Sequence, residues 1–258
     1  MKITALPQHL LRHRLVCLMK TIKVRALVLR EYEAGESDKR LLLLCKEHGR
    51  IMAYARGARK PSSKFMAASQ LFTYADFVLA MGNGFYSVTQ AEVIESFYSL
   101  RQDYDRLMTA CSVVELCEKT VWDNINCDVL LQLALKTLSH LSKGKLPHLQ
   151  VYCVFLHRFL MFHGIWPRVQ SCIVCNAPAT ESNFLCPEGL VCDKHKPPAA
   201  ISISTAAITA LQFIQNSDLA QSFMFNAHEN VISELKKAAS NILKSHELLL
   251  QNKMNMTI

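Results

Sequence analysis

Two short pairs of metal-binding residues constrain this chain more than any other feature. Cys172 and Cys175 are separated by two residues, and Cys192 and His195 repeat that spacing after an intervening loop. Two ligands at this spacing can reach one metal ion from a single tight turn, and two such pairs complete the tetrahedron that zinc prefers. Because four protein ligands leave no position for water, the pattern predicts a structural zinc site rather than a catalytic one.

Other interpretations of these cysteines stay open at this point. Cys186 lies in the loop between the pairs and could replace Cys192 or His195 as the fourth ligand. The thiols could also be ordinary buried side chains, since free cysteine is among the most buried residue types. A redox Cys-x-x-Cys motif should open a helix after a strand, whereas this one follows an apolar helix and Pro167. We favour zinc because the second pair repeats the spacing of the first.

The length of 258 residues favours two small domains over one large one. The ten cysteines do not indicate a disulfide framework, because the chain is long and the basic residues at 12–14 interrupt the apolar run of an export signal. The apolar stretch 151–162 contains His157 and Arg158, so we expect a core helix there and not a membrane span. Thiols kept reduced point to a cytoplasmic location.

The positive charge is concentrated at one end of the chain. The net charge is +8, but residues 1–65 carry 15 Lys and Arg against 5 Asp and Glu, while residues 66–258 carry 14 against 16. Such segregation is typical of a module that binds a polyanion such as nucleic acid. The simpler alternative is a basic surface that only aids solubility.

The first part of the chain has the pattern of a β domain. Apolar residues alternate from Thr21 to Arg30, and Gly82-Asn83-Gly84 is a strong hairpin signal between two later runs. Five short strands separated by glycine-containing turns suit a small closed barrel, and the OB-fold is the common five-stranded one. We expect strands at 21–30, 39–45, 50–56, 70–81 and 85–94.

After Ser96 the periodicity becomes helical, with apolar residues recurring every three or four positions. Helices are expected at 104–121, 129–141, 149–163, 204–214 and 231–249. The fold class is therefore a multidomain β + α protein in which an OB-fold barrel precedes an α-helical domain with an inserted zinc loop. The expected parts are a possible extension at 1–18, the OB-fold domain at 19–97, the first helical part at 98–170, the zinc-binding loop at 171–197, the second helical part at 198–251 and a frayed tail at 252–258.

The basic segment interleaves cations with aromatic residues. Single-strand binders need a positive groove for phosphates and flat rings on which bases stack. The most specific part of this segment is Arg56-Gly57-Ala58-Arg59-Lys60. It places three cations around a glycine that permits close approach of the backbone to phosphate. Taken singly, most of the aromatic residues would be barrel core and most of the lysines solvated charges. The cluster comprises Lys23, Arg25, Arg30, Lys39, Arg40, Arg50, Arg56, Arg59, Lys60 and Lys64, with Tyr32, Tyr54, Phe65 and Tyr86.

No catalytic constellation is visible in the sequence. It contains no G-x-S-x-G, no glycine-rich phosphate loop and no H-E-x-x-H. His157 and His163 lie on an apolar helix and are expected to be core or edge residues. The sequence therefore predicts a binding protein and not an enzyme.

Three motifs in this order resemble the bacterial RecO recombination and repair mediators, over about residues 20–249. The first motif covers the first two predicted strands and the turn after them. The second motif is the basic segment after the third predicted strand, and the third motif surrounds the predicted zinc ligands. The residues that carry the resemblance are Ala26–Arg30 with Tyr32, Gly35-Glu36-Ser37-Asp38 and Glu47-His48-Gly49; Ala55–Lys60; and Phe159-Leu160, Gly164, Pro167, Cys172, Cys175, Pro187-Glu188-Gly189 and Cys192.

The resemblance implies a non-enzymatic role in DNA repair by the RecFOR pathway. RecO-like proteins bind single- and double-stranded DNA and anneal complementary strands. With RecR they help to load RecA onto strands coated by the single-strand-binding protein SSB, whose acidic, apolar C-terminal tail they bind. The resemblance also implies a cytoplasmic, nucleoid-associated location. It assigns DNA contact to Arg56, Arg59, Lys60, Arg30, Lys39 and Arg40, and structural zinc to Cys172, Cys175, Cys192 and His195.

The sequence departs from the family pattern at a few positions. The family usually begins near Met19, so residues 1–18 are expected to be an extension or a misassigned start. His195 stands where a cysteine is common, which zinc tolerates. Asn176 stands where a glycine is common, and asparagine accepts left-handed backbone geometry better than most residues. Some members lack the metal, so the zinc is expected to be dispensable for the core activity.

Two other functions compete with the mediator hypothesis. An RNA-binding or translation-associated OB-fold protein with a zinc ribbon would have the same basic barrel, and preference for structured RNA would favour it. A metal-dependent nuclease is the third possibility, although no acidic cluster in the sequence supports it.

Overall fold

The computed structural model describes residues 20–82, 84–179 and 183–255, with residues 247–255 as backbone alone. The expected extension at 1–18 and Asn83 of the hairpin turn lie outside the described residues. The chain divides into two compact units. Among the described residues, the barrel unit comprises 20–96 (without 83) together with 121–127, and the helical unit comprises 97–120, 128–179 and 183–255.

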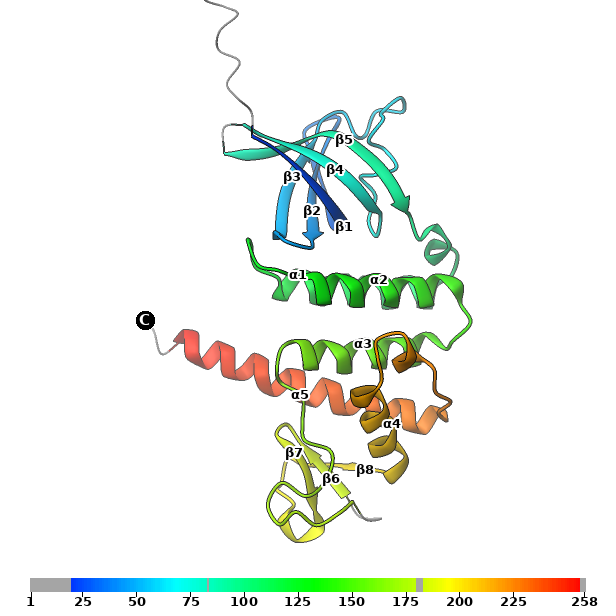
Figure 1. Cartoon of the computed structure of the whole chain (residues 1–258), viewed down its shortest axis with the longest axis vertical. Coiled ribbons are helices and arrows are strands. Elements are labelled where there is room, and N and C mark those ends of the chain that lie inside the picture. The colour runs from blue at the N-terminus through cyan, green and yellow to red at the C-terminus, as the bar shows by residue number, and fades with distance from the viewer. Residues whose placement is uncertain (1–19, 83, 180–182, 256–258) are drawn as a thin grey trace, which may run out of the picture. The chain divides into compact units, whose positions relative to one another are not determined.

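The barrel unit is a closed sheet of five strands in the order β1-β2-β3-β5-β4 (Figure 1). All neighbouring strands are antiparallel except β3 and β5, which pair in parallel at Ala53 and Tyr54. The predicted five-stranded barrel is therefore confirmed. The strands are β1 (Thr21–Ala34), β2 (Asp38–Cys45), β3 (Gly49–Ala55), β4 (Tyr74–Gly82) and β5 (Phe85–Glu95).

A bulge in β1 sets which side chains face outward at one end of the barrel. Before it, Val28 pairs with Leu43, and both side chains are in the core. The register shifts between Val28 and Arg30, so that Glu31 pairs with the core residue Leu41. Because side chains alternate along a strand, Glu31 turns toward the interior and the next residue turns outward. Simple alternation read from the sequence does not reveal this change.

The connection between β3 and β4 covers the barrel interior. Ala58, Phe65 and Ala68 from this segment pack into the barrel core. The buried hydroxyl groups of Ser69 and Thr73 donate to carbonyl oxygens of the same segment. The predicted fourth strand at 70–81 therefore begins later, at Tyr74, because the residues before it form turns.

Residues 121–127, between the helices α1 (Tyr104–Thr120) and α2 (Asp128–Lys143), belong to the barrel unit. The backbone N–H groups of Asn124 and Cys127 donate to His48 and Lys46 at 2.8 Å each, and the N–H of Arg50 donates to the carbonyl of Trp122 at 3.2 Å. Gly49 has a φ of +62°, and a Cβ there would lie 2.2 Å from the Trp122 carbonyl oxygen. Only glycine fits this close approach.

Five helices form the helical unit within the described residues. They are α1 (Tyr104–Thr120), α2 (Asp128–Lys143), α3 (His148–Phe162), α4 (Thr205–Asn216) and α5 (Glu229–Asn255), with short 3₁₀ turns at Tyr98–Gln102 and Gln221–Phe223. Helix α3 is the most buried, and it contacts α1, α2, α4 and α5. The five predicted helices are present, and α5 continues past its predicted end at Leu249.

The region predicted as a zinc loop contains strands. β6 (Asn183–Cys186), β7 (Gly189–Cys192) and β8 (Ile201–Ile203) form a small antiparallel sheet in the order β7-β6-β8 (Figure 1). Cys192 ends β7, and His195 lies in the following 3₁₀ turn, Asp193–His195. These strands have three or four residues each, too few for a reliable alternation pattern in sequence.

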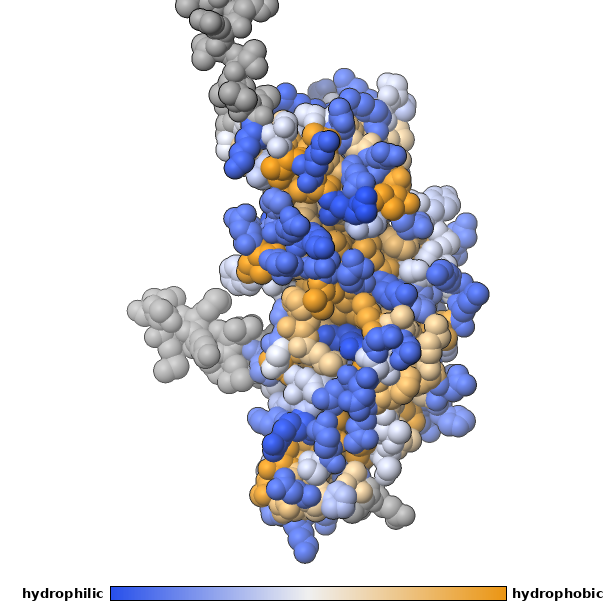
Figure 2. Space-filling view, in the orientation of Figure 1, coloured by the Kyte–Doolittle hydropathy of each residue, from blue (hydrophilic) through white to orange (hydrophobic). Residues whose placement is uncertain are grey.

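No helix in the described part of the chain is long and apolar enough to cross a membrane. On the face seen in Figure 2, hydrophilic side chains predominate over the barrel, and apolar ones form small patches between them. The apolar side chains of the barrel strands lie mainly in its interior.

Candidate metal centre and nucleic-acid interface

The structure brings the four predicted zinc ligands together. One ligand atom from each of Cys172, Cys175, Cys192 and His195 lies within 4.8 Å of all the others. The Sγ atoms of Cys175 and Cys192 are 3.8 Å apart, and Nδ1 of His195 lies 3.2 Å from Sγ of Cys192 and 3.8 Å from Sγ of Cys172. Tetrahedral zinc with Zn–S bonds of about 2.3 Å places its sulfur ligands about 3.8 Å apart. The group therefore fits a metal ion of this kind.

A tight turn orients the first cysteine pair. The N–H of Asn176 donates to the Cys172 carbonyl, and the N–H of Cys172 donates to the Ala177 carbonyl, both at 2.9 Å. Asn176 has a φ of +58°, the left-handed geometry that was expected at this position. A hydrogen bond from the backbone N–H of Cys175 is the main cause that lowers the pKa of the Cys172 thiol to about 6. At Cys172 the turn therefore favours the thiolate, which is the form that binds metal, whereas the pKa of Cys175 is raised.

Cys186, the alternative ligand, is not part of this group. Its thiol donates to the Gly189 carbonyl at 3.0 Å, and burial raises its pKa. It packs with Val191 and with Cys172, one of the four candidate ligands, in a small cluster of buried residues. Cys186 therefore supports the fold of the turn and lies outside the proposed coordination shell.

The basic segment after β3 lies at the end of the barrel where β1 turns into β2. The N–H of Arg59 donates to the Ser37 carbonyl at 2.9 Å, and the N–H of Gly57 donates to Oδ1 of Asp38 at 2.7 Å. These bonds hold the β1–β2 turn against the segment. The glycine amide is therefore used within the protein, which differs from the phosphate approach suggested by the sequence.

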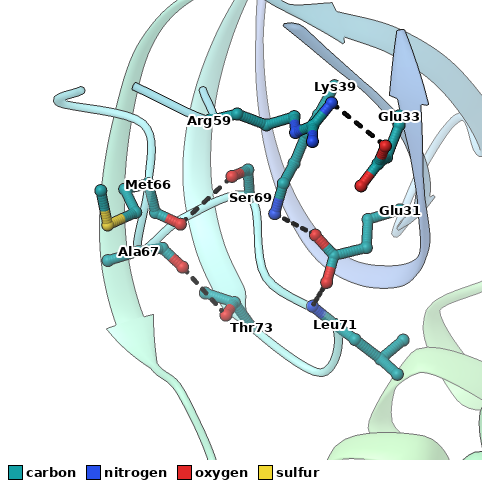
Figure 3. A network of polar contacts seen from close by, with 9 residues as sticks. All are labelled: Glu31, Glu33, Lys39, Arg59, Met66, Ala67, Ser69, Leu71 and Thr73. Carbon is teal, nitrogen blue, oxygen red and sulfur yellow. Dashed lines mark hydrogen bonds and ion pairs between the residues drawn. The ribbon is translucent and has the colours of Figure 1, made fainter. Parts of the chain in front are cut away.

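Two of the predicted DNA-contacting cations are held in ion pairs (Figure 3). Nζ of Lys39 pairs with Glu31, whose other carboxylate oxygen accepts the Leu71 N–H at 3.4 Å, and the Lys39 side chain is only 18% exposed. The guanidinium of Arg59 lies 3.1 Å from the Glu33 carboxylate. Both pairs depend on the register created by the β1 bulge. Within the described structure, Lys39 therefore neutralises Glu31.

The other predicted cations point outward. Arg56 and Lys60 are exposed, and none of the residues that the structure describes pairs with either side chain. Arg30 is also exposed. Arg40 lies over the ring of Tyr32, with its guanidinium carbon 5.0 Å from the ring centroid. The end of the barrel therefore presents cations on its surface, as phosphate contacts require.

Sequence reasoning missed two features that the fold assembles. Phe85 at the start of β5 is 60% exposed and contacts Tyr54. In the helical unit, an apolar cavity of about 260 Å³ has Arg158 at its wall. The cavity joins α2, α3 and the segment before the Gln221–Phe223 turn, so no local motif could reveal it; it is lined by Val129, Leu133, Arg158, Met161, Phe162 and Leu219.

The chain has a closed five-stranded barrel with cations at one end, and helices and a Cys₃His group follow it. This arrangement places it in a class of proteins in which a small barrel precedes a helical domain. Comparison with known families agrees with this arrangement. The profile described as recombination protein O N terminal matches residues 19–97, and the profile described as recombination protein O C terminal matches residues 101–252. The chain belongs to the RecO family of DNA repair proteins.

Individual relatives are similar over most of their length. The DNA repair protein RecO of Acetivibrio thermocellus is 36% identical over 234 residues, which cover 88% of this chain and 92% of the relative. The protein of the same name from Alkaliphilus metalliredigens is 33% identical over 190 residues, covering 73% of this chain and 77% of that protein. The one from Bacillus mycoides is 29% identical over 200 residues, or 76% and 80% of the two chains.

Proposed function

We propose that this protein is a non-enzymatic recombination mediator that binds single- and double-stranded DNA and anneals complementary strands. Together with RecR, it would help to load RecA onto strands coated by SSB. The observation that carries the DNA-binding part is the set of outward-facing cations at one end of the barrel, in a family of DNA repair proteins. Family membership also favours DNA over the RNA-binding alternative.

The proposed mechanism of annealing is electrostatic. Arg56 and Lys60 contact phosphates most directly, and Arg40 and the exposed Arg30 add further contacts. Arg59 and Lys39 contribute less, because acidic partners partly neutralise them. Neutralising phosphates on two strands at once lowers the repulsion that slows formation of the first base pairs. If about six phosphates are contacted, duplex affinity falls by roughly three decades between 50 and 200 mM salt.

The experiment that tests this function is annealing of two complementary strands already coated with SSB, at two salt concentrations. We expect the protein to accelerate annealing, and to do so less at the higher salt. If the protein binds DNA but does not accelerate annealing, it is a general nucleic-acid-binding protein and not a mediator. A stronger preference for structured RNA than for DNA would move the RNA-binding alternative to the front.

We further propose that the Cys₃His group binds a structural zinc ion. Zinc would supply four bonds that hold the Cys172–Cys175 turn against the end of β7, and the four ligands leave no open position for chemistry. Elemental analysis of the purified protein should give one zinc per chain. A metal-free but folded protein would contradict the proposal.

The apolar cavity of the helical unit is the proposed site for the C-terminal tail of SSB. An acidic, apolar tail needs an apolar socket with a cation beside it. Arg158 meets this need: it donates to the carbonyls of Ser217 and Asp218, while its buried Nε has no hydrogen-bond partner in the described structure. Val129 lies at the cavity and is 65% exposed, so changes there should not disturb folding.

Two substitutions of opposite charge at position 129 test this site. Val129→Glu places a negative charge beside the cavity and should weaken binding of an SSB tail peptide at least tenfold. Val129→Lys makes a side chain of similar reach with the opposite charge, and it should retain binding or improve it. Equal binding by both variants would exclude this cavity as the tail site.

A further inference from the structure

A row of four side chains crosses the outer face of the barrel. Tyr32 of β1 lies opposite Arg40 of β2, and Arg40 lies opposite Tyr54 of β3. The row continues to Phe85 of β5, whose ring meets that of Tyr54 edge to face, with centroids 5.8 Å apart and an interplanar angle of 86°. Four strands thus contribute one side chain each, and three of the four are aromatic.

The accessibility of the row sets it apart from the barrel core. Its strand neighbours Leu41, Ala53 and Ala55 are buried in the interior, so the row lies on the opposite face. Tyr32 and Tyr54 are half-buried, Arg40 is exposed, and Phe85 is 60% exposed. Packing inside the barrel therefore does not account for the exposed phenyl ring of Phe85.

Charge in the row complements the rings. The guanidinium carbon of Arg40 lies over the Tyr32 ring, 5.0 Å from its centroid, and no acidic side chain in the described ranges pairs with Arg40. Arg56 follows Tyr54 by two residues, just past the end of β3. Aromatic faces beside cations are the combination with which proteins hold unpaired nucleic-acid strands, because rings stack on bases and cations contact phosphates.

We propose that Tyr32, Arg40, Tyr54 and Phe85 form a stacking platform for the bases of single-stranded DNA. This proposal rests on the DNA-binding function proposed above and specifies which part of the ligand the barrel recognises. The platform spans three inter-strand spacings, about 14 Å. Four-stranded sheets in RNA-binding domains stack two or three bases on such a surface. A duplex keeps its bases stacked on one another, so the platform distinguishes unpaired from paired strands.

The test measures binding of Phe85→Ala to an oligothymidylate strand and to a duplex of equal length. Removal of one stacking ring should weaken single-strand binding about fivefold or more. Duplex affinity should change less than twofold. The slope of affinity against salt should stay the same, because no phosphate contact is removed.

Two further variants make the result specific. Tyr104→Ala removes another exposed aromatic ring, 74% accessible and located on α1, and should bind as the unaltered protein does. Phe85→Trp keeps a stacking ring at the platform. It should retain single-strand affinity, and its added tryptophan emission should be quenched when oligothymidylate is added.

The outcomes separate the platform from the DNA-binding function. If Phe85→Ala and Tyr54→Ala both bind single strands normally while Arg56→Ala/Lys60→Ala does not, the platform is excluded and the function stands. Equal losses on single strands and duplex in Phe85→Ala would also overturn base stacking. Failure of the unaltered protein to bind DNA would instead refute the proposed function.

Discussion

The barrel and the small sheet beside the Cys₃His group are stabilised in different ways. The barrel interior contains large apolar side chains from all five strands, such as Val24, Leu41, Ile51, Phe77 and Val88. The turns that carry the Cys₃His group share a small cluster, whose buried members among the described residues are Cys172, Cys186 and Val191. The barrel therefore has an extensive apolar core, whereas the cysteine turns have a small one, which the proposed zinc would supplement.

Loss of a proposed zinc ligand should have the largest effect of the changes considered. Cys172→Ser should abolish zinc binding and lower the free energy of unfolding of the helical unit on the order of 5 kcal/mol. Isolated zinc fingers gain about 10–16 kcal/mol from zinc binding. The loss expected here is smaller, because Leu185 and Leu190 stay packed against the helical core. Denaturant unfolding combined with metal analysis measures both quantities.

Cys186→Ser is the matched control for that change. Serine can still donate to the Gly189 carbonyl, so zinc content should be unchanged and the loss of stability should be about 1 kcal/mol. DNA affinity should be retained in both variants if the metal serves only the fold. A loss of zinc in Cys186→Ser, with zinc retained in Cys172→Ser, would mean that the ligands are assigned wrongly.

A substitution that creates a cavity in the barrel core should have the next largest effect on the free energy of unfolding. Leu43 is fully buried, and Leu43→Ala should cost about 3 kcal/mol, within the range of 2–5 kcal/mol for such changes. The zinc content should not change, since the two regions are stabilised separately. Thermal unfolding followed with and without a chelator tests this separation, and a chelator effect on the barrel would refute it.

The helical core should lose stability in mild acid. His157 is fully buried and donates from Nε2 to the Leu235 carbonyl at 3.0 Å, and burial lowers its pKa from 6.5 to about 4. Because the folded state holds the neutral form, this contribution is complete above pH 6.5 and is lost as the pH falls toward 4. The loss amounts to about 3 kcal/mol.

Urea unfolding at pH 7 and pH 5 measures this dependence, and His157→Gln provides the control. Glutamine can donate to the same carbonyl but does not titrate, so the variant should lose much less stability between the two pH values. An equal loss in both proteins would assign the acid sensitivity to other groups, such as His163, whose pKa burial also lowers.

The sequence was sufficient for the features that depend on local pattern. Alternation and turn glycines predicted the five strands, and the spacing of the Cys and His pairs predicted the four residues that the fold brings together. Asn176 was expected to adopt left-handed geometry, and it does. These features involve residues near one another in the chain or a repeated spacing.

Features that depend on register or on packing between elements could not be predicted. The pairing of Lys39 with Glu31 follows from the bulge in β1, which one extra residue creates without a sequence signal. The strands around Cys192 were too short to show alternation. The row that ends at Phe85 requires the β3–β5 pairing, which joins strands separated by the whole of β4.

The most direct test of DNA binding by the barrel end is the salt dependence of single-strand affinity for the unaltered protein and for Arg56→Ala/Lys60→Ala. We expect the double variant to bind more weakly to all sequences alike, and the slope of log affinity against log salt to become shallower by about 1.4, or 0.7 per lost phosphate contact. Unchanged affinity with an unchanged slope would remove these two residues from the DNA site and contradict the account.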